Sequence, residues 1–259
     1  MTQDERLDFL LRYLLAERKE YADVRVPDDV SEKRRLLRSL MNVRPPSPAS
    51  EDFLNVQDAY LREQLAEKGV TKPADLAPVQ PGLYLWQGDI TTLAVDAIVN
   101  AANSRLLGCF VPCHSCIDNA VHTCAGVQLR LECARIMAGQ KKEEPAGRAK
   151  ITKAYNLPCH YVLHTVGPVI CGAVTKTHRE KLASCYRSCL ELAAQSGLHS
   201  VAFCCISTGE FHFPNKPAAQ VAIRTVREWQ RKNPGKIEDV YKRQHLFFPD
   251  IEWLWRMTQ

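Results

Sequence analysis

Residues 108–116 read Gly-Cys-Phe-Val-Pro-Cys-His-Ser-Cys, which places four potential metal ligands within eight residues. Zinc prefers thiolate and imidazole ligands, and a catalytic zinc keeps one position open beside three protein ligands. The segment therefore predicts a metal site, and the ligand types favour zinc over iron or copper. Spacing alone leaves open which of Cys109, Cys113, His114 and Cys116 bind the metal.

The position of this cluster supports a functional site. It contains Pro112 and directly precedes a predicted helix, whose N-terminus favours thiolates. Cysteines elsewhere in the chain are typical of small core residues, and with eleven in all some fall close together by chance. Asp118 follows at the helix start, where a carboxylate can act as a general base or only complement the helix dipole.

Three further polar segments each follow a predicted strand, where open α/β sheets bind their ligands. Asp89 can accept a hydrogen bond from an exocyclic amine such as that of adenine. The amides of Asn100 and Asn103 suit sugar hydroxyls, and the backbone N–H groups of residues 207–209 can hold a diphosphate. Each segment on its own is also typical of an ordinary turn. They are Gln-Gly-Asp-Ile-Thr at 87–91, Val-Asn-Ala-Ala-Asn at 99–103 and Ile-Ser-Thr-Gly-Glu-Phe at 206–211.

Strands alternate with helices from Pro81 onwards, which predicts an α/β fold with a mostly parallel sheet between helical layers. The first long helix is expected to run unbroken over residues 117–137. The expected strands are 82–86, 96–99, 149–154, 161–165 and 201–206, and the later helices are 179–195 and 217–230.

Residues 1–75 predict a helical extension that precedes an α/β domain over residues 76–238. Apolar residues recur there at helical spacing in three stretches. Ser31 and Ser50 can cap the second and third helices, and Gly69 can end the third. The extension carries no chemical motif, so a packing or partner-docking role is expected.

The last 21 residues, 239–259, do not continue this pattern. Residues 236–238 begin a strand that Asp-Val-Tyr-Lys-Arg-Gln at 239–244 is expected to break. This hexapeptide resembles the translation of a transposon adapter used in DNA sequencing libraries. We expect the natural coding sequence of this protein to be followed only as far as about Glu238, and residues 245–259 to be foreign.

Composition narrows the functional classes. The net charge is +5, with 34 basic and 29 acidic residues and no dense basic run, so no nucleic-acid partner is expected while a small anionic ligand is compatible. No apolar stretch reaches the roughly 18 residues of a membrane span, and the charged N-terminus is unlike a secretion signal. We expect a cytoplasmic protein with reduced thiols and no membrane partner.

Taken together and in this order, these segments resemble the macrodomain family, whose members bind ADP-ribose. The resemblance runs over residues 82–233 and includes Val-Gly-Pro at 166–168 and Ala-Val-His at 120–122. It implies a three-layer α/β/α fold with a mixed, mostly parallel sheet. It also implies that Asp89 and Ile90, with Gly88, meet the adenine end, and that Asn100 and Asn103, with Ala101, face the distal ribose. The diphosphate and ribose would be wrapped by Ser207, Thr208, Gly209, Glu210 and Phe211.

Macrodomain hydrolases usually have a glycine-rich loop where this chain has its cysteines. The loop instead resembles that of a zinc-containing macrodomain subfamily of bacteria and fungi, with its C-x4-H-x-C form. This resemblance implies that Cys109, His114 and Cys116 hold Zn²⁺ and that Cys113 is a bystander. Asp118 aligns with an acidic residue near the distal ribose of related hydrolases, which implies a catalytic role that we extend to Asn103.

The activity implied is hydrolytic removal of mono-ADP-ribose from protein side chains at C1″ of the distal ribose. A zinc ion there would polarise an oxygen or lower the pKa of a water molecule. Bacterial members resemble enzymes encoded beside a sirtuin-like transferase and a lipoyl-carrier protein, which implies a lipoylated carrier protein as the substrate.

Two alternatives belong to other functional classes. The domain could be a reader of ADP-ribose with a purely structural zinc, closed by Cys113 or His122 as a fourth ligand. A thiol-based redox protein could use Cys113 and Cys116. That reading requires the motif after the first strand, whereas two predicted strands precede it here.

Overall fold

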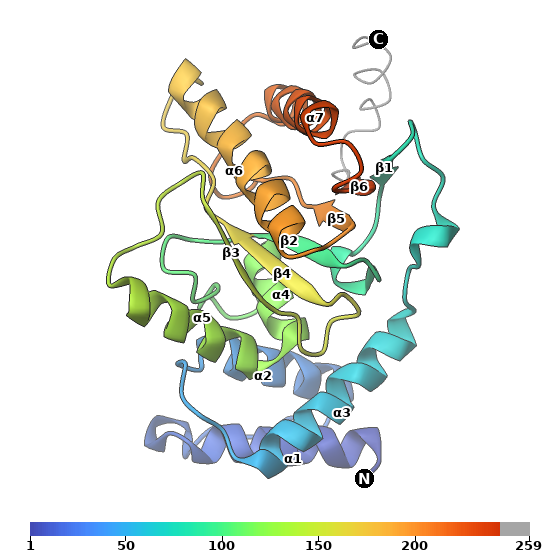
Figure 1. Cartoon of the computed structure of the whole chain (residues 1–259). Coiled ribbons are helices and arrows are strands. Elements are labelled where there is room, and N and C mark those ends of the chain that lie inside the picture. Colours follow the sequence, from blue (N-terminus) through green and yellow to red (C-terminus); the bar gives the residue numbers. More distant parts are fainter. Residues whose placement is uncertain (244–259) are drawn as a thin grey trace.

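The computed structural model describes residues 1–243, which form an α/β domain resting on three N-terminal helices (Figure 1). The suspect segment 245–259 lies outside the described residues. Within residues 1–243, none of the helices combines the length and apolar character needed to cross a membrane.

The sheet has six strands in the order β1-β6-β5-β2-β4-β3. All neighbouring strands run parallel except β3 and β4, so the predicted mixed, mostly parallel sheet is confirmed. The central strands are apolar and buried, as expected for strands covered on both faces. The strands are β1 Leu83–Trp86, β2 Ala97–Ala101, β3 Ala149–Lys153, β4 Tyr161–Thr165, β5 Ser200–Phe203 and β6 Asp239–Arg243.

Helices cover both faces of this sheet and complete the predicted three layers (Figure 1). α4 and α5 pack against β2 and β3, while α6 packs against β3, β4 and α7. The helices are α4 Ile117–Ala125, α5 Val127–Gln140, α6 Lys176–Gln195 and α7 Asn215–Lys232, and a 3-10 turn, η3, spans Ile90–Thr92.

The single helix expected over residues 117–137 is wrong, because the chain breaks into α4 and α5 at Gly126. This glycine has a φ of 97°, a conformation that other residues rarely adopt. A side chain there would also meet the amide of Gln57, whose Oε1 accepts a hydrogen bond from Val127 N at 3.0 Å. The N-terminal extension therefore seals the helix break.

The N-terminal helices are α1 Gln3–Ala16, α2 Val30–Val43 and α3 Glu51–Lys68, and their inner faces form an apolar cluster of their own. Ser50 caps α3 by accepting from Phe53 N, and Gly69 ends that helix, as predicted. The predicted cap at Ser31 is wrong: Asp29 caps α2 by accepting from Glu32 N.

The predicted break at residues 239–244 is also wrong, because residues 239–243 form β6. Val240 and Tyr241 are buried in the sheet, and the Tyr241 ring stacks on Tyr84 at 4.4 Å between centroids. An apolar pair of this kind suits a strand that lies between two others. Whether the segment is native is a separate question and stays a prediction.

β5 is shorter than the strand expected over residues 201–206. It ends at Phe203, and the chain then turns, with Ile206 N donating to Cys204 O at 3.1 Å and Ser207 at a φ of 65°. This turn directs the following polar segment towards the start of α4.

Candidate active site

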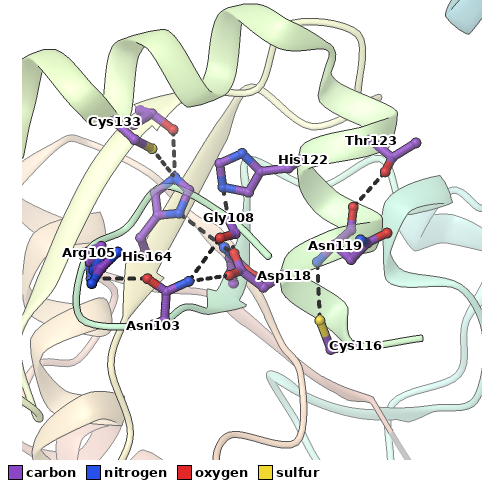
Figure 2. Close-up of polar contacts among 12 residues, drawn as sticks. Asn103, Arg105, Gly108, Cys116, Asp118, Asn119, His122, Thr123, Cys133 and His164 are labelled. Atoms are coloured by element: carbon purple, nitrogen blue, oxygen red, sulfur yellow. Dashed lines mark hydrogen bonds and ion pairs between the residues drawn. The ribbon is translucent and has the colours of Figure 1, made fainter. Parts of the chain in front are cut away.

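Asp118 occupies the first turn of α4 and is only 5% exposed. Its two carboxylate oxygens accept hydrogen bonds from two asparagine amides that follow β2. Asn100 Nδ2 donates to Oδ1 at 2.8 Å. Asn103 Nδ2 donates to Oδ2 at 3.1 Å (Figure 2). The structure thus joins the carboxylate predicted to be catalytic to both amides predicted to face the distal ribose.

Asn103 also shapes the chain that leads to the cysteines. Its amide donates to Gly108 O at 3.0 Å, and its carbonyl accepts from Arg105 N at 3.0 Å (Figure 2). Gly108 has a φ of 78°, and a Cβ there would lie 2.8 Å from the His122 ring. This position therefore requires glycine. The turn at Gly108 places the next residue, Cys109, beside α4.

Burial raises the pKa of Asp118 to about 6, opposed by the hydrogen bond from Asn100, the charge of Arg130 and the hydrogen bond from Asn103. A carboxylate with a pKa this close to neutrality can exchange a proton with a substrate during a reaction. Each carboxylate oxygen has a second lone pair, so the two amides leave acceptor capacity for a ligand.

A buried histidine that the sequence analysis missed supports Asn100 from behind. His164 Nδ1 lies 3.2 Å from Asn100 Nδ2, and its Nε2 lies 2.9 Å from Thr152 Oγ1. Burial lowers the pKa of His164 to about 4, so the ring is neutral and has one acceptor nitrogen. We assign that role to Nδ1, because an amide nitrogen can only donate to it. Asn100 Oδ1 then stays buried without a partner and can accept from a ligand hydroxyl.

His122, Cys133 and His164 form a second group of possible ligand atoms within 4.8 Å of one another. Both nitrogens of His164 are already engaged, so hydrogen bonding accounts for that ring without a metal. Burial lowers the pKa of His122 well below its usual value, and its Nε2 lies 3.6 Å from Asp118 Oδ1. His122 therefore belongs to the surroundings of Asp118 and lies outside the Cys109 group.

The donor atoms of Cys109, His114 and Cys116 all lie within 4.8 Å of one another. Cys109 Sγ is 3.7 Å from His114 Nδ1. In a tetrahedral zinc site, neighbouring sulfur and nitrogen ligands are separated by about 3.5 Å, as the usual bond lengths require. The three residues therefore fit a zinc ion in type and spacing. We call residues 109–116 the metal loop.

Cys116 is both the last donor of the metal loop and the cap of α4, since its Sγ accepts from Asn119 N at 3.4 Å. Burial raises the pKa of Cys116 to about 12, and the neighbouring Cys109 adds to the rise. A cation bound between these thiols would reverse that preference, because a metal binds the thiolate.

Cys113 points away from the three donors. Its φ is 52°, and its Sγ lies 3.2 Å from Ser39 Oγ and 3.4 Å from Arg35 O, both on α2. The structure therefore brings together three of the four potential metal ligands and turns the fourth, Cys113, towards the N-terminal extension.

The segment after β5 borders the metal loop. Glu210 Oε1 lies 3.5 Å from His114 Nε2, so this predicted diphosphate residue reaches a predicted metal ligand. Ser207 is buried, and a side chain at Gly167 would overlap its hydroxyl, so the turns after β4 and β5 are in direct contact. The remaining predicted residues of this segment are Thr208, whose hydroxyl donates to Cys205 O, the exposed Gly209, and Phe211, whose carbonyl accepts from Ile170 N.

The segment after β1 is ordered by its own side chains. Asp89 caps η3 by accepting from Thr91 N at 3.0 Å, and its other oxygen lies 3.7 Å from Lys68 Nζ. Ile90 is fully buried, and Gly88 lies so close to the Trp86 ring that a side chain there would overlap it. Ala101 ends β2 between the two asparagines and is half-buried.

The fold is that of a macrodomain. The Macro domain family model matches residues 99–222, and the chain belongs to the macrodomain family. The chain is 56% identical over 245 residues to a protein-ADP-ribose hydrolase from Treponema medium, covering 93% of this chain and 94% of that protein. It is 48% identical over 238 residues to a protein of the same name from Staphylococcus aureus (strain MRSA252), covering 91% and 89%.

Solved structures agree with this assignment. The Trypanosoma brucei macrodomain in complex with ADP-ribose matches with a TM-score of 0.61 and 31% identity, over 84% of this chain and 90% of that one. The Oceanobacillus iheyensis macrodomain with ADP matches with a TM-score of 0.59 and 32% identity, over 68% and 92%.

Proposed function

We propose that this protein is a zinc-dependent hydrolase that removes mono-ADP-ribose from modified protein side chains. One observation carries the proposal: Asp118 is held between Asn100 and Asn103, two residues from the last donor of the metal loop. The protein-ADP-ribose hydrolases that resemble the chain over most of its length support the activity.

ADP-ribose would lie across the carboxyl ends of the strands, where open α/β sheets bind their ligands. The similar Trypanosoma brucei macrodomain, solved in complex with ADP-ribose, supports the choice of ligand. In this proposal the turn at Asp89 meets the adenine end and residues 207–211 hold the diphosphate. Asn100 then offers its unpartnered Oδ1 to a hydroxyl of the distal ribose. The reacting C1″ atom would come to lie between Asp118 and the metal loop.

Hydrolysis adds a water oxygen to C1″, breaks the bond from C1″ to the side chain and returns a proton to the released side chain. Asp118 would accept the proton from the water or from a ribose hydroxyl, as its raised pKa allows. Asn103 would keep this carboxylate oriented and fix the turn before the metal loop. Zinc held by Cys109, His114 and Cys116 would supply Lewis-acid polarisation of an oxygen at this centre.

The two alternative classes fit the geometry less well. A reader with a structural zinc needs a fourth protein ligand, yet Cys113 faces α2 and His122 lies against Asp118. A redox pair of Cys113 and Cys116 is disfavoured for the same reason, since the Cys113 sulfur points towards Ser39. Three converging donors support an open, catalytic position.

We extend the proposal to the substrate and the compartment. A lipoylated carrier protein bearing mono-ADP-ribose is the proposed partner. The proposed metal ligands Cys109 and Cys116 are free thiols, which fits the reducing environment of the cytoplasm.

The deciding experiment incubates the protein with an ADP-ribosylated carrier protein, with and without a zinc chelator. Parallel samples carry Cys116→Ala and Asp118→Ala, and Cys171→Ala serves as the matched cysteine control because Cys171 is exposed and outside the site. We expect release of ADP-ribose only from the untreated wild type and the control. Binding without turnover in every sample would contradict the enzyme proposal. Turnover that survives confirmed metal loss would contradict the zinc mechanism.

A further inference from the structure

The N-terminal extension contacts the metal loop through polar side chains of α2. Arg38 Nη2 donates to the carbonyl of His114 at 2.9 Å. The same guanidinium donates to Asn119 Oδ1, from Nη2 at 2.8 Å and from Nε at 3.2 Å. One side chain of the extension thus ties the backbone of a predicted metal ligand to the helix that Cys116 caps.

A second residue of α2 holds the middle of the same loop. Asn42 is 1% exposed, and its Oδ1 accepts from Cys113 N at 2.9 Å while its Nδ2 donates to Thr123 Oγ1 at 2.9 Å. Ser39 adds the contact of its Oγ with Cys113 Sγ. Positions 38, 39 and 42 lie on one face of a helix, so this face of α2 is directed at the loop.

Two further side chains also connect the loop to α2. Asn119 Nδ2 donates to Val111 O at 3.0 Å, so the amide that binds Arg38 also holds the loop. The Arg130 guanidinium lies over the Phe110 ring at 4.3 Å and donates to Met41 O, at the end of α2, at 3.1 Å.

We propose that the N-terminal extension pre-orders the metal site, with Arg38 and Asn42 as positioning residues for the metal loop. The inference rests on the proposed zinc binding and adds a role that the extension's sequence does not suggest. A loop that is ordered before the metal arrives loses less conformational entropy on binding, so affinity rises. Groups that orient metal ligands typically change affinity by about 10- to 100-fold when removed.

A purely structural role for α2 makes a different prediction. The apolar cluster shared by α1, α2 and α3 stabilises the extension without reaching the metal loop. If α2 only packed, removing Arg38 would lower the melting temperature and leave zinc affinity as it is. Zinc affinity is therefore the readout that separates positioning from packing.

The test compares zinc affinity, measured by competition with a chromophoric chelator, in the full chain and in Arg38→Met and Asn42→Ala. The control is Arg35→Met, which removes the same charge from the same helix. The Arg35 side chain is exposed and makes none of these contacts, and the substitution keeps the backbone carbonyl that faces Cys113 Sγ. Thermal melting of the metal-free proteins is recorded in parallel. We expect each of the two variants to bind zinc at least about tenfold more weakly than wild type, and the control to match wild type.

Zinc affinity within twofold of wild type in a folded Arg38→Met protein would overturn the inference. If Arg38→Met does not fold, Arg38→Lys replaces it. Lysine keeps the charge but cannot bond His114 O and Asn119 Oδ1 in the same fork, so weaker zinc binding is again expected. A wild-type protein that binds no zinc would refute the zinc proposal itself. Zinc binding unchanged by the α2 substitutions would refute only the pre-ordering role.

Discussion

The side chains of Asn100 and His164 lie opposite each other on β2 and β4, with Asn100 Nδ2 3.2 Å from His164 Nδ1. The same amide nitrogen donates to Asp118, so a neutral histidine on one strand determines which atom of Asn100 faces the carboxylate. The orientation of Asn100, and through it of the proposed catalytic carboxylate, thus depends on a buried residue of β4.

Replacing His164 by leucine removes the acceptor that fixes the Asn100 amide. We expect kcat to fall by about 10- to 100-fold with a smaller change in KM, because misplacing a catalytic group acts mainly on the reacting complex. Steady-state kinetics on an ADP-ribosylated carrier protein measure both parameters. His164→Gln keeps an acceptor and should lose less activity, and an unchanged kcat in a folded His164→Leu protein would contradict the role.

The same histidine makes stability depend on pH. Its pKa is about 4 in the folded protein against an ordinary value of 6.5, so between these values the unfolded chain binds a proton that the folded chain does not. The free energy of unfolding therefore decreases as the pH falls from 6.5 towards 4. One such group contributes at most about 1.4 kcal/mol per pH unit. His122, whose pKa is also lowered, likewise reduces the free energy of unfolding as the pH falls. Asp118, whose pKa is raised, has the opposite effect and increases it as the pH falls.

Urea unfolding of the metal-free wild type and His164→Leu between pH 4.5 and 7, roughly the window set by these pKa values, checks this prediction. The variant lacks one titrating group, so its loss of stability on acidification should be smaller by the contribution of one proton. If the free energy of unfolding changed with pH equally in the two proteins, His164 would not titrate as proposed.

Glu210 should support the metal through His114. Its carboxylate lies 3.5 Å from His114 Nε2 and could orient a ring that binds zinc through Nδ1. Because this carboxylate is 69% exposed, we expect Glu210→Gln to weaken zinc binding only a few-fold. The chelator competition assay measures it. Glu238→Gln is the matched control, since Glu238 lies 3.6 Å from His199, outside the site, and should leave the affinity unchanged.

A side chain at Gly167 should disturb the proposed diphosphate site. The new Cβ of Gly167→Ala would overlap the hydroxyl of the buried Ser207, so the turn after β5 must move. Overpacking of this kind costs about 1–3 kcal/mol, and we expect ADP-ribose affinity to fall at least about tenfold, as measured by calorimetry. Gly139→Ala meets nothing within 4 Å and should bind ADP-ribose as wild type does. Equal affinity in Gly167→Ala would argue against a ligand at this turn.

Much of the fold was predictable because each element carries a local signal. Apolar runs marked the strands, and Ser50 and Gly69 marked the ends of α3. The errors came where distant contacts outweighed that signal. Gln57 accepts a hydrogen bond from Val127 at the helix break beside Gly126. Val240 and Tyr241 form part of β6 because this segment pairs with β1 and β5.

The sequence by itself determined the chemistry of the metal loop. Cys109, His114 and Cys116 lie within one short segment, and so few residues cannot separate their side chains far in space. The resemblance of the surrounding segments supplied the ligand class. The proximity of Asp118 to these donors was predictable for the same reason, since only one residue separates it from Cys116.

Only the tertiary structure decided which groups orient that chemistry. Cys113 is turned out of the donor group by a left-handed backbone conformation and by contacts with a helix more than 70 residues earlier in the chain. His164 meets Asn100 because β2 and β4 pair in one register, and a shift of one residue would point it to the other face. Arg38 reaches His114 because α2 packs against α4. Such contacts join residues far apart in the chain, so no local pattern in the sequence records them.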